Sequence, residues 1–408
     1  MTNEQALFAN DTQDNVFVFT PDEGISYSDT TISTKAHAAV TNMVAPVPFC
    51  DFNFKQGVLD ELMRIDPVLY AGHTIASNIY PEDVEKIVTL DLSTEPIWID
   101  NTLTFERGIE DMDGIQYFTN LEHLNLRNNH LLHEIDISNN AALTTLNLHF
   151  TNLIRLDVSN NAALTSLDVS LNALEELDVS NNTALTMLNV YRNRLSELDV
   201  SSNAALVALN VSSNWRLENL DVSNNTELTV LNASFCGLAR IDISNNLRLK
   251  ELRVGANELT DIDVSNNTAL TTLILSHNPL ESVDIQNNTA LIRLDATNTT
   301  LTSLDVSNNI ALADLSVAES QLTNLDSSNN PALITIRASH NELNSIDVSN
   351  SPELILLDVG HNQLTNLDVS NNPMLVNLNV SSNQLTSLVV YTPSLDSLSV
   401  IWNPLTCF

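Results

Sequence analysis

The chain has 408 residues, and its 51 acidic side chains against 16 basic ones give a net charge of −35 at pH 7. This charge disfavours nucleic acids and anionic membrane surfaces as partners, because lysine and arginine are the side chains that bind phosphate. No window holds 18 consecutive apolar residues, so membrane insertion is not expected. The three cysteines are far apart and do not indicate a disulfide framework.

The N-terminal part of the chain differs from the rest. Residues 1–50 are polar with short apolar runs, and we expect a partly ordered extension there. The first 20 residues lack the basic start and the long apolar core of a secretory signal. In residues 51–86, apolar side chains recur at helical spacing until Pro67, and Pro81-Glu82-Asp83 is typical of a helix start. We interpret residues 51–86 as a helical cap over the first coil of a repeat array.

An internal repeat occupies residues 87–408, with about fifteen copies and a usual period of 21 residues. Each copy, or rung, has the pattern LxxLxLxxNxL, whose positions are numbered here from one to eleven. A looser copy begins at Ile87. The regular copies begin at Leu121, Leu143, Leu164, Leu185, Leu206, Leu228, Leu249, Leu270, Leu291, Leu312, Leu333, Leu354, Leu375 and Leu395.

Each rung contains two segments with the alternation of a strand. Leu146 and Leu148 flank Asn147, and Leu156 and Val158 flank an aspartate ten residues later. The pattern predicts two extended sides joined by two bends. A single rung cannot bury its own leucines, so neighbouring rungs must stack to form a common core.

This pattern resembles the leucine-rich-repeat family, in particular the 21-residue class found in internalin-type bacterial surface proteins. The resemblance extends from Ile87 to about Leu405. It implies an α/β-type repeat solenoid that is mostly β, a horseshoe with a parallel concave sheet and a small helical N-terminal cap. A relative of this class carries a cysteine ladder at position six. Here that position holds Leu148, Val169 and Val190, so the ladder is absent.

Two polar columns run along the array. The asparagine at position nine is expected to satisfy backbone groups in a buried bend. Because the chain has only 8 glycines, we expect Asn-Asn pairs to build the bends, since asparagine tolerates left-handed dihedral angles. An aspartate recurs on the convex side, where we expect Asx-type hydrogen bonds. A row of weak calcium sites is the alternative there, and no other cofactor is expected. The convex aspartates are Asp136, Asp157, Asp178, Asp199, Asp221, Asp242, Asp263, Asp284, Asp305, Asp326, Asp347 and Asp368.

Positions three, five, seven and eight are expected to point outward on the concave face, where the rungs differ most. Exposed aromatic and arginine side chains are favoured in binding sites; the alternative is partial burial by the adjoining bend. The candidate partner-binding residues are His149, Phe150, Leu171, Tyr191, Arg192, Trp215 and Phe235 in the first half and Arg253, Arg293 and Arg337 in the second.

One histidine pair could also hold a ligand. His340 and His361 occupy position eight of adjacent rungs, so their rings could meet. Such a pair can bind a metal ion or respond to pH. Two ligands alone make a weak site, and we therefore predict no metal centre.

The sequence contains none of the nucleophile, zinc-protease, P-loop or dinucleotide motifs of common enzymes. We predict a non-catalytic module that recognises a protein or glycan ligand on the concave face, and a monomer unless the C-terminal end pairs. The resemblance implies an adhesin-like protein at the cell surface or outside the cell. One alternative is an intracellular, cytoplasmic scaffold or effector. Another is the recognition domain of a larger protein whose catalytic part lies elsewhere.

Overall fold

The computed structural model of the chain is divided into two units, residues 1–43 and 44–408. The structure describes residues 45–99, 102–105, 108–390 and 393–406. The predicted N-terminal extension, residues 1–50, therefore lies almost entirely outside the described residues. Everything below concerns the second unit.

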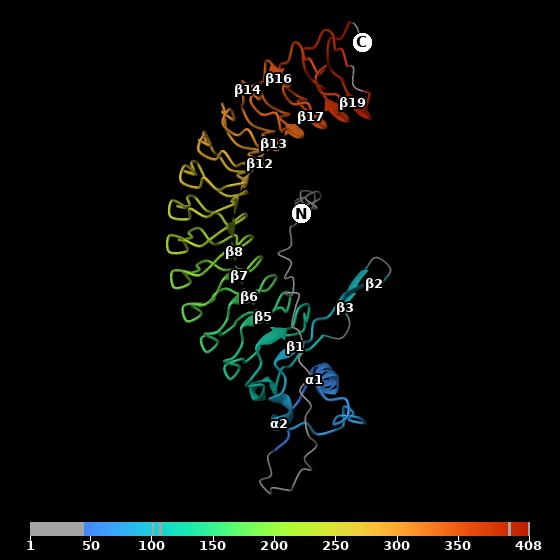
Figure 1. The fold of residues 1–408 in the computed structure, drawn as a ribbon, viewed down its shortest axis with the longest axis vertical. Coiled ribbons are helices and arrows are strands. Elements are labelled where there is room, and N and C mark those ends of the chain that lie inside the picture. The colour runs from blue at the N-terminus through green and yellow to red at the C-terminus, as the bar shows by residue number, and fades with distance from the viewer. Residues whose placement is uncertain (1–44, 100–101, 106–107, 391–392, 407–408) are drawn as a thin grey trace, which may run out of the picture. The chain divides into compact units, whose positions relative to one another are not determined.

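Two helices precede the array, α1 (Phe52–Ile65) and α2 (Pro81–Val84) (Figure 1). Asp51 caps α1, since its Oδ1 accepts a hydrogen bond from the Phe54 backbone N–H at 2.9 Å. The helix ends just before Pro67, as the sequence predicts, and α2 has its proline in the first turn. None of the helices among the described residues has the length and apolar character needed to cross a membrane.

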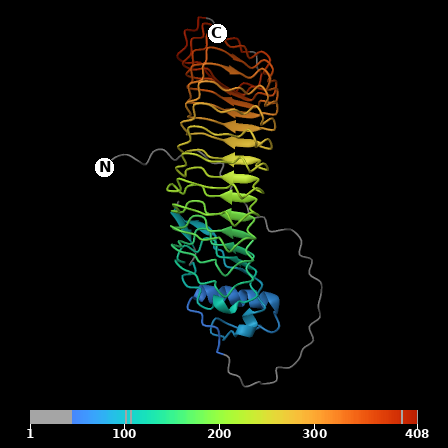
Figure 2. The same cartoon turned by 90° about the vertical axis from the view of Figure 1, so that its left-hand side faces the viewer.

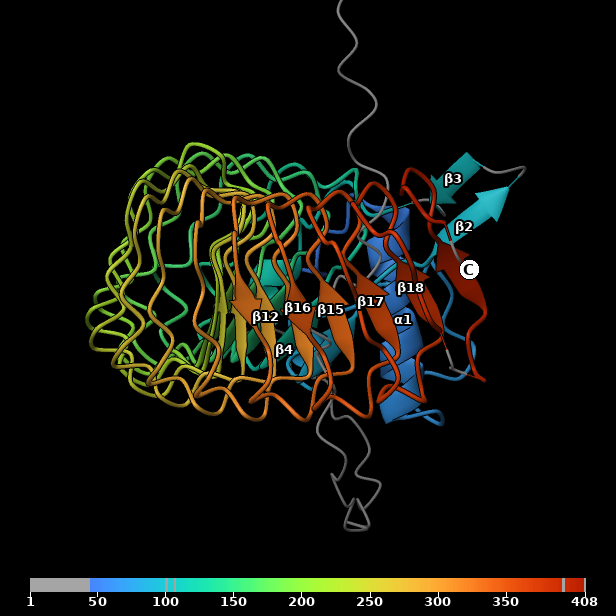
Figure 3. The same ribbon diagram turned by 90° about the horizontal axis from the view of Figure 1, so that it is seen from above.

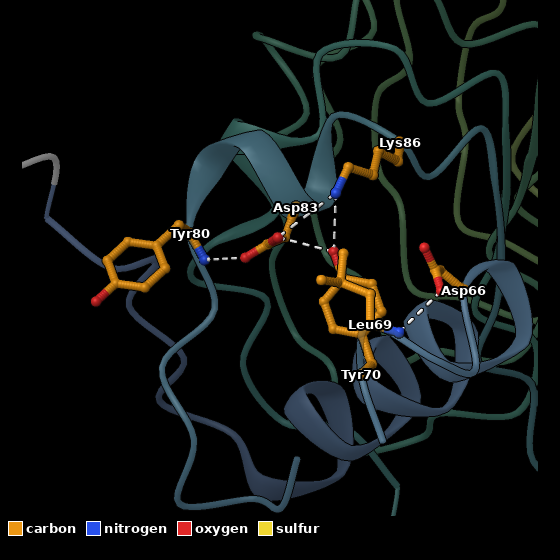
Figure 4. Close-up of polar contacts among 6 residues, drawn as sticks. All are labelled: Asp66, Leu69, Tyr70, Tyr80, Asp83 and Lys86. Carbon is orange, nitrogen blue, oxygen red and sulfur yellow. Dashed lines mark hydrogen bonds and ion pairs between the residues drawn. The ribbon is translucent and has the colours of Figure 1, made fainter. Parts of the chain in front are cut away.

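A polar cluster joins the segment after α1 to α2 (Figure 4). The Tyr70 hydroxyl donates to Asp83 Oδ1 at 2.7 Å and accepts from Lys86 Nζ at 3.0 Å. The other Asp83 oxygen accepts from the Tyr80 backbone N–H at 2.9 Å. Burial and the neighbouring Asp83 carboxylate raise the pKa of the Tyr70 hydroxyl, so it remains a donor at neutral pH. These contacts fix α2 against the chain that follows α1.

The buried face of α1 packs on the start of the array. Phe54 lies 6.0 Å from Phe118, measured between ring centroids, and both side chains are fully buried. Asp51 Oδ2 accepts a hydrogen bond from the Glu110 backbone N–H at 2.8 Å. The segment that contains Phe118 includes a short 3-10 helix, η1 (Ile115–Tyr117). The cap is thus tied to the first coils by both apolar and polar contacts.

A hairpin that the repeat pattern does not predict lies between the first two rungs. It is formed by β2 (Pro96–Ile99) and β3 (Thr102–Phe105), which pair antiparallel (Figure 1). The sequence of this insertion lacks the leucine spacing of the array, which is why the repeat gave no indication of it.

The rungs form one 15-stranded parallel sheet on the inner, concave side of a curved stack (Figures 1 and 2). Each rung contributes one strand, and consecutive rungs are hydrogen-bonded neighbours. The strands are β1 (Thr89–Asp91), β4 (His123–Asn125), β5 (Thr145–Asn147), β6 (Ser166–Asp168), β7 (Met187–Asn189), β8 (Ala208–Asn210), β9 (Val230–Asn232), β10 (Glu251–Arg253), β11 (Thr272–Ile274), β12 (Arg293–Asp295), β13 (Asp314–Ser316), β15 (Thr335–Arg337), β17 (Leu356–Asp358), β18 (Asn377–Asn379) and β19 (Ser397–Ser399).

The register of the sheet aligns the leucines of position four. Leu146 pairs with Leu167, and Leu167 pairs with Leu188. These side chains are essentially fully buried, as are those of positions one and six in the regular rungs before the last, where Leu395 and Val400 are only partly buried. The core is therefore a set of continuous columns, each built from one position of the repeat, which confirms the predicted solenoid.

The convex side is less regular than predicted. Its segments form strands only in β14 (Leu325–Asp326) and β16 (Ile346–Asp347), with one further bridge between Asp368 and Val389. The other described convex segments consist of turns and extended residues without strand pairing. Seen along the stack, each rung has its strand on one side and loops on the other (Figure 3). The alternation of apolar residues correctly predicted that this side is buried. It could not predict which of the convex segments would pair as strands.

Candidate functional site

The asparagines of position nine have a structural role, as predicted. In a typical rung, Asn172 Nδ2 donates to the carbonyl oxygens of Val169 and, one rung earlier, of Leu148, at 2.9 and 2.8 Å. Its Oδ1 accepts from the Leu153 backbone N–H at 2.7 Å. The amide is therefore fully used inside the stack and is not available to a ligand.

The residues at position eight have left-handed backbone conformations in every regular rung, with φ between 53° and 67°. The expectation that Asn-Asn pairs adopt this conformation is wrong for the described pairs on the convex side, such as Asn160-Asn161, none of which has a positive φ; Asn128, in the pair Asn128-Asn129, does adopt it. The position-eight column comprises Asn128, Phe150, Leu171, Arg192, Ser213, Phe235, Ala256, His277, Asn298, Glu319, His340, His361, Ser382 and Trp402.

Backbone hydrogen bonds between rungs hold this column in place. The Phe150 N–H donates to the Ser170 carbonyl at 2.9 Å, and the Leu171 N–H donates to the Tyr191 carbonyl at 2.8 Å. A left-handed conformation costs a residue with a side chain about 1–2 kcal/mol, whereas glycine adopts it freely and asparagine more readily than most. The column nevertheless carries large side chains at many rungs, including phenylalanine, tryptophan, leucine and arginine. Their presence where glycine or asparagine would fit better suggests selection for the side chains themselves.

The first half of this column carries the predicted apolar edge. Phe150, Leu171 and Arg192 lie on three consecutive rungs, because β5, β6 and β7 pair in register. Phe150 and Leu171 are half-buried and Arg192 is exposed. Two rungs beyond Arg192, Phe235 is 51% exposed. These four residues form one edge of the concave sheet, as expected.

Trp215 lies between Arg192 and Phe235 along the chain, in the rung with the one-residue insertion. It is 63% exposed, and the Arg216 guanidinium lies over its ring, 4.4 Å from the centroid. An exposed tryptophan with a stacked guanidinium is the kind of group that protein and glycan interfaces use. We call Phe150, Leu171, Arg192, Trp215 and Phe235 the aromatic edge.

Beside this edge lies a buried polar group that the sequence analysis missed. The Ser170 hydroxyl donates to Asp168 Oδ1 at 2.5 Å and lies 2.8 Å from His149 Nδ1. The Asp168 carboxylate also accepts from the Ser170 backbone N–H and from Asn189 Nδ2. Burial lowers the pKa of His149, although the Asp168 carboxylate opposes this effect. Since Ser170 donates to Asp168, a neutral His149 carries its proton on Nδ1, and the contact orients the imidazole.

This group does not form a nucleophilic triad. In such a triad the histidine accepts the serine proton and the carboxylate contacts the histidine. Here the serine lies between the other two side chains and gives its proton to the carboxylate. Ser170 and Asp168 are also buried. The arrangement supports the concave surface at His149 and Tyr191 and offers no nucleophile.

The predicted arginines of the second half are engaged in ion pairs. Arg253 pairs with Glu251 of its own strand. Arg293 and Arg337 approach one carboxylate, that of Asp314, at 3.6 and 3.2 Å. The structure thus brings Arg293 and Arg337 together across three rungs, while Arg253 lies apart from them. Because these pairs are half-exposed, each stabilises the fold only slightly.

The type of residue at position two also differs between the two halves of the array. In the first half it is mostly threonine, and the Thr165 hydroxyl donates to the preceding Thr144 carbonyl at 3.1 Å. In the second half Ile292, Ile334 and Ile355 stand at this position with exposed side chains. This exposed aliphatic column is a second apolar surface that the sequence analysis did not single out, although the repeat alignment could have revealed it.

The convex aspartates form the predicted Asx turns. Asp157 Oδ1 accepts from the Ser159 backbone N–H at 2.9 Å, and the same geometry recurs at Asp178 and Asp199. Hydrogen bonds from the serine hydroxyl and N–H lower the pKa of each of these carboxyls. Among the described residues, none of the convex aspartates belongs to a set of three close ligand groups. Calcium binding there stays a prediction.

One such set does occur in the cap. Ligand atoms of Cys50, Asp111 and Asp113 all lie within 4.8 Å of one another, at an exposed site. The Cys50 thiol donates to Asp113 at 3.6 Å, and desolvation and the two aspartates raise its pKa.

The predicted contact between His340 and His361 is confirmed. Their rings are stacked, with centroids 4.1 Å apart and an interplanar angle of 10°. The indole of Trp402, also in the position-eight column, lies edge-on to His361 at 6.3 Å.

Comparison with known proteins gives structural relatives only. No family model and no curated protein matches the chain. The functional domain of internalin J (InlJ) from Listeria monocytogenes, which includes a cysteine ladder, is 27% identical and has a TM-score of 0.68, over 84% of this chain and 78% of that one. The internalin InlF of the same organism is 23% identical, with a TM-score of 0.69 over 88% and 98% of the two chains.

A third relative is the leucine-rich-repeat protein LIC12759 of Leptospira interrogans, which is 21% identical. Its TM-score is 0.60, and the match covers 78% of this chain and 97% of that one. Unlike internalin J, the present chain holds leucine, valine or alanine at position six of its rungs, for example Leu148, Val169 and Ala233. By its repeat and its fold, the chain is a leucine-rich-repeat protein that resembles the bacterial internalins.

Proposed function

We propose that the protein is a non-catalytic binding module that holds a protein partner on the concave sheet and the aromatic edge of its first half. The observation that carries this proposal is the position-eight column. It places Phe150, Leu171, Arg192 and Phe235 along one edge in a strained conformation that glycine would adopt without cost. The resemblance to internalins supports a location at the cell surface or outside the cell.

Two features favour a protein over a glycan as the ligand. The aromatic edge contains Trp215 and Arg192, with Arg216 stacked on the tryptophan, and tryptophan and arginine are enriched in protein hot spots. The net charge of −35 also favours a basic surface on the partner, because complementary charge speeds association. A partner with an apolar centre and a basic rim would match both features.

The proposal can be tested by capture of partners from host-cell and cell-wall extracts on the immobilised protein. The variant combines Phe150→Asn, Tyr191→Ser and Phe235→Asn, because asparagine and serine already occupy these two columns in other rungs. A captured protein should be lost from the variant, with the melting temperature unchanged or higher, since asparagine tolerates the left-handed conformation.

A matched control is Ile334→Thr with Ile355→Thr, which replaces two of the three isoleucines of the exposed aliphatic column by the residue that is most frequent at this position in the first half. This control should retain the partner. Loss of the partner from the control and its retention by the triple variant would move the binding site to the second half. Capture of a glycan in place of a protein would contradict the proposed partner class.

A further inference from the structure

The exposed aliphatic column is part of a larger apolar surface on the edge of the sheet opposite the aromatic edge. Position two precedes each strand and position eight follows it, so the two columns lie at opposite ends of the parallel strands. In five consecutive rungs position two is aliphatic without interruption, and two side chains that precede position one extend this surface. We call these residues the aliphatic strip: Ile292, Ile310, Ala313, Ile334, Ile355, Met374 and Val376.

The large side chains of this strip are exposed. Ile310 is 62% exposed and Met374 is 49% exposed, and the three isoleucines of position two are between 40% and 50% exposed. In the first half of the array the same position mostly carries threonine. A contiguous exposed apolar surface of this kind is typical of an interaction site.

The strip contains a regular row, because position two is hydrogen-bonded from rung to rung. The Ala313 N–H donates to the Ile292 carbonyl and the Ile334 N–H to the Ala313 carbonyl, both at 2.8 Å, and Ile355 and Val376 continue the row in the same way. Its side chains therefore repeat at the strand spacing of about 4.8 Å, over about 19 Å in all. A row of evenly spaced β-branched side chains interlocks best with another row of the same spacing, as in the dry interfaces between stacked sheets. A second copy of the chain supplies such a row.

The surroundings of the row are nearly uncharged, although the chain has a net charge of −35. At position three and at the residue before position one, these five rungs carry three charged side chains, Arg293, Asp314 and Glu353. Arg293 and Asp314 form an ion pair at 3.6 Å. Two copies of so acidic a chain repel each other over most of their surfaces, so a nearly uncharged strip is where a second copy can approach.

We propose that the aliphatic strip is the contact between two copies of the chain, related by a two-fold axis at Ile334. An axis at this place reverses the direction of the row, so each Ile334 faces its counterpart. It also places Ile355 of one copy opposite Ala313 of the other, a large side chain against a small one. Both copies use the same residues in such a contact, as in most protein dimers.

The charges beside the row fit the same axis. Arg293 and Arg337 share the Asp314 carboxylate, so this group has one guanidinium charge in excess. Glu353 stands on the other side of the row, in the rung of Ile355. The two-fold axis exchanges the two sides of the row, and Glu353 of each copy then approaches the Asp314 group of the other.

The contact is small, because it involves five rungs of each copy. Small interfaces are typical of weak association, and we expect a dissociation constant in roughly the micromolar range. Since the aliphatic strip and the aromatic edge lie at opposite ends of the strands, the dimer leaves both aromatic edges accessible.

The test is sedimentation velocity of the full chain over a concentration series, with Cys50→Ser and Cys407→Ser in all samples. The wild type should change from monomer to dimer as the concentration rises. The variant Ile334→Thr with Ile355→Thr should weaken association at least about tenfold, because two exposed isoleucines of each copy leave the contact. Circular dichroism should show an unchanged fold, since threonine occupies position two in the first half.

Two further variants test the place of the contact. Glu353→Arg should weaken association, because an arginine would then face the guanidinium groups of the other copy. The matched control is Leu247→Thr, which removes an aliphatic side chain that is 57% exposed and lies outside the strip. Threonine stands at the equivalent place in both neighbouring rungs, as Thr226 and Thr268, and this control should associate like the wild type.

Position 334 also allows a direct test of the axis. In the variant Ile334→Cys the two thiols face each other, so oxidation should link two copies by a disulfide. Ile292→Cys should be linked far less, because position 292 lies opposite the other end of the row. A wild type that stays monomeric throughout the series, or equal association by the double threonine variant, would overturn the proposal. Equal linking of the two cysteine variants would overturn the two-fold arrangement.

Discussion

One buried amide in most rungs, at position nine, satisfies backbone groups inside the stack. The position-nine amide bonds to two carbonyl oxygens and one N–H in adjacent rungs, so it replaces the hydrogen bonds that water would otherwise supply. Where the sequence has Cys236 at this position, its thiol donates to the Val211 carbonyl at 3.3 Å. Burial raises the pKa of Cys236 to about 12, so the thiol keeps its proton and its role as donor.

The variant Asn193→Ala should lose about 2–4 kcal/mol of unfolding free energy, because it leaves buried backbone groups unsatisfied. Asn193 Nδ2 donates to the carbonyls of Val169 and Val190, and its Oδ1 accepts from the Leu174 N–H. Urea unfolding followed by circular dichroism would measure the loss.

The control for this prediction is Asn193→Thr. Threonine stands naturally at position nine of two rungs, where the Thr151 hydroxyl donates to the Leu148 carbonyl at 2.9 Å and the Thr299 hydroxyl to the Ala296 carbonyl at 3.0 Å. The threonine variant should therefore lose clearly less stability than the alanine variant. Equal losses would mean that side-chain volume, and not hydrogen bonding, matters at this position.

In the convex turns, the negatively charged aspartate also accepts the hydrogen bonds that shape the turn. Asp157 and Asp199 each accept from the serine two residues later, and these bonds lower the pKa of the carboxyl groups in the folded state. A depressed carboxyl pKa stabilises the fold fully above the unfolded value of about 3.9. This stabilisation is lost as the pH falls through the folded-state pKa.

The contribution of these carboxyl groups to the free energy of unfolding should therefore change little between pH 7 and about pH 5. It should fall steeply below about pH 4. Urea midpoints measured across this range would show it. The triple variant Asp157→Asn, Asp178→Asn, Asp199→Asn should have a shallower acid loss, because asparagine can accept the same bond without titrating. Asn147 does so with the His149 N–H at 3.0 Å.

An acid loss as steep in the triple variant as in the wild type would show that other carboxyl groups dominate. The same urea melts at pH 7, with and without calcium, would decide the calcium hypothesis for the convex aspartates. Identical midpoints would exclude it.

At the scale of the whole molecule, the array depends on the helical cap that covers its N-terminal end. A rung is stable only when both of its apolar faces are covered, and α1 covers the first one. Gly57 lies in the middle of α1, where glycine is normally unfavourable. A methyl group there would overlap the Leu92 side chain of the first rung, so this glycine allows the helix to approach the array closely.

The variant Gly57→Ala should therefore destabilise the protein by about 1–3 kcal/mol, as overpacking does, although alanine favours a helix. Thermal unfolding would measure the change. In a double-mutant cycle with Leu92→Ala, the second substitution should recover part of the loss, because it makes room for the new methyl group. A more stable Gly57→Ala variant would mean that α1 and the first rung are loosely packed.

Most of the array could be predicted from the sequence. The leucine spacing predicts the sheet, the core columns and the ladder of position nine, because stacked identical rungs have one way to bury the same positions. The helices of the cap followed from Pro67 and Pro81 together with the apolar spacing between residues 54 and 65. The edge that carries Phe150 and Phe235 could also be found, since residues 21 apart lie on neighbouring rungs.

Only the tertiary structure decided the remaining features. The left-handed conformation of position eight arises from hydrogen bonds between rungs, so residue propensity, which favours asparagine there, did not identify it. The links from Asp168 to His149 and from Asp314 to Arg293 and Arg337 depend on side-chain directions across strands. A repeat specifies which positions meet, because its period sets the register. The period does not specify which of these side chains form hydrogen bonds or ion pairs with one another. Those contacts depend on side-chain positions to within a few ångströms, which only the tertiary structure gives.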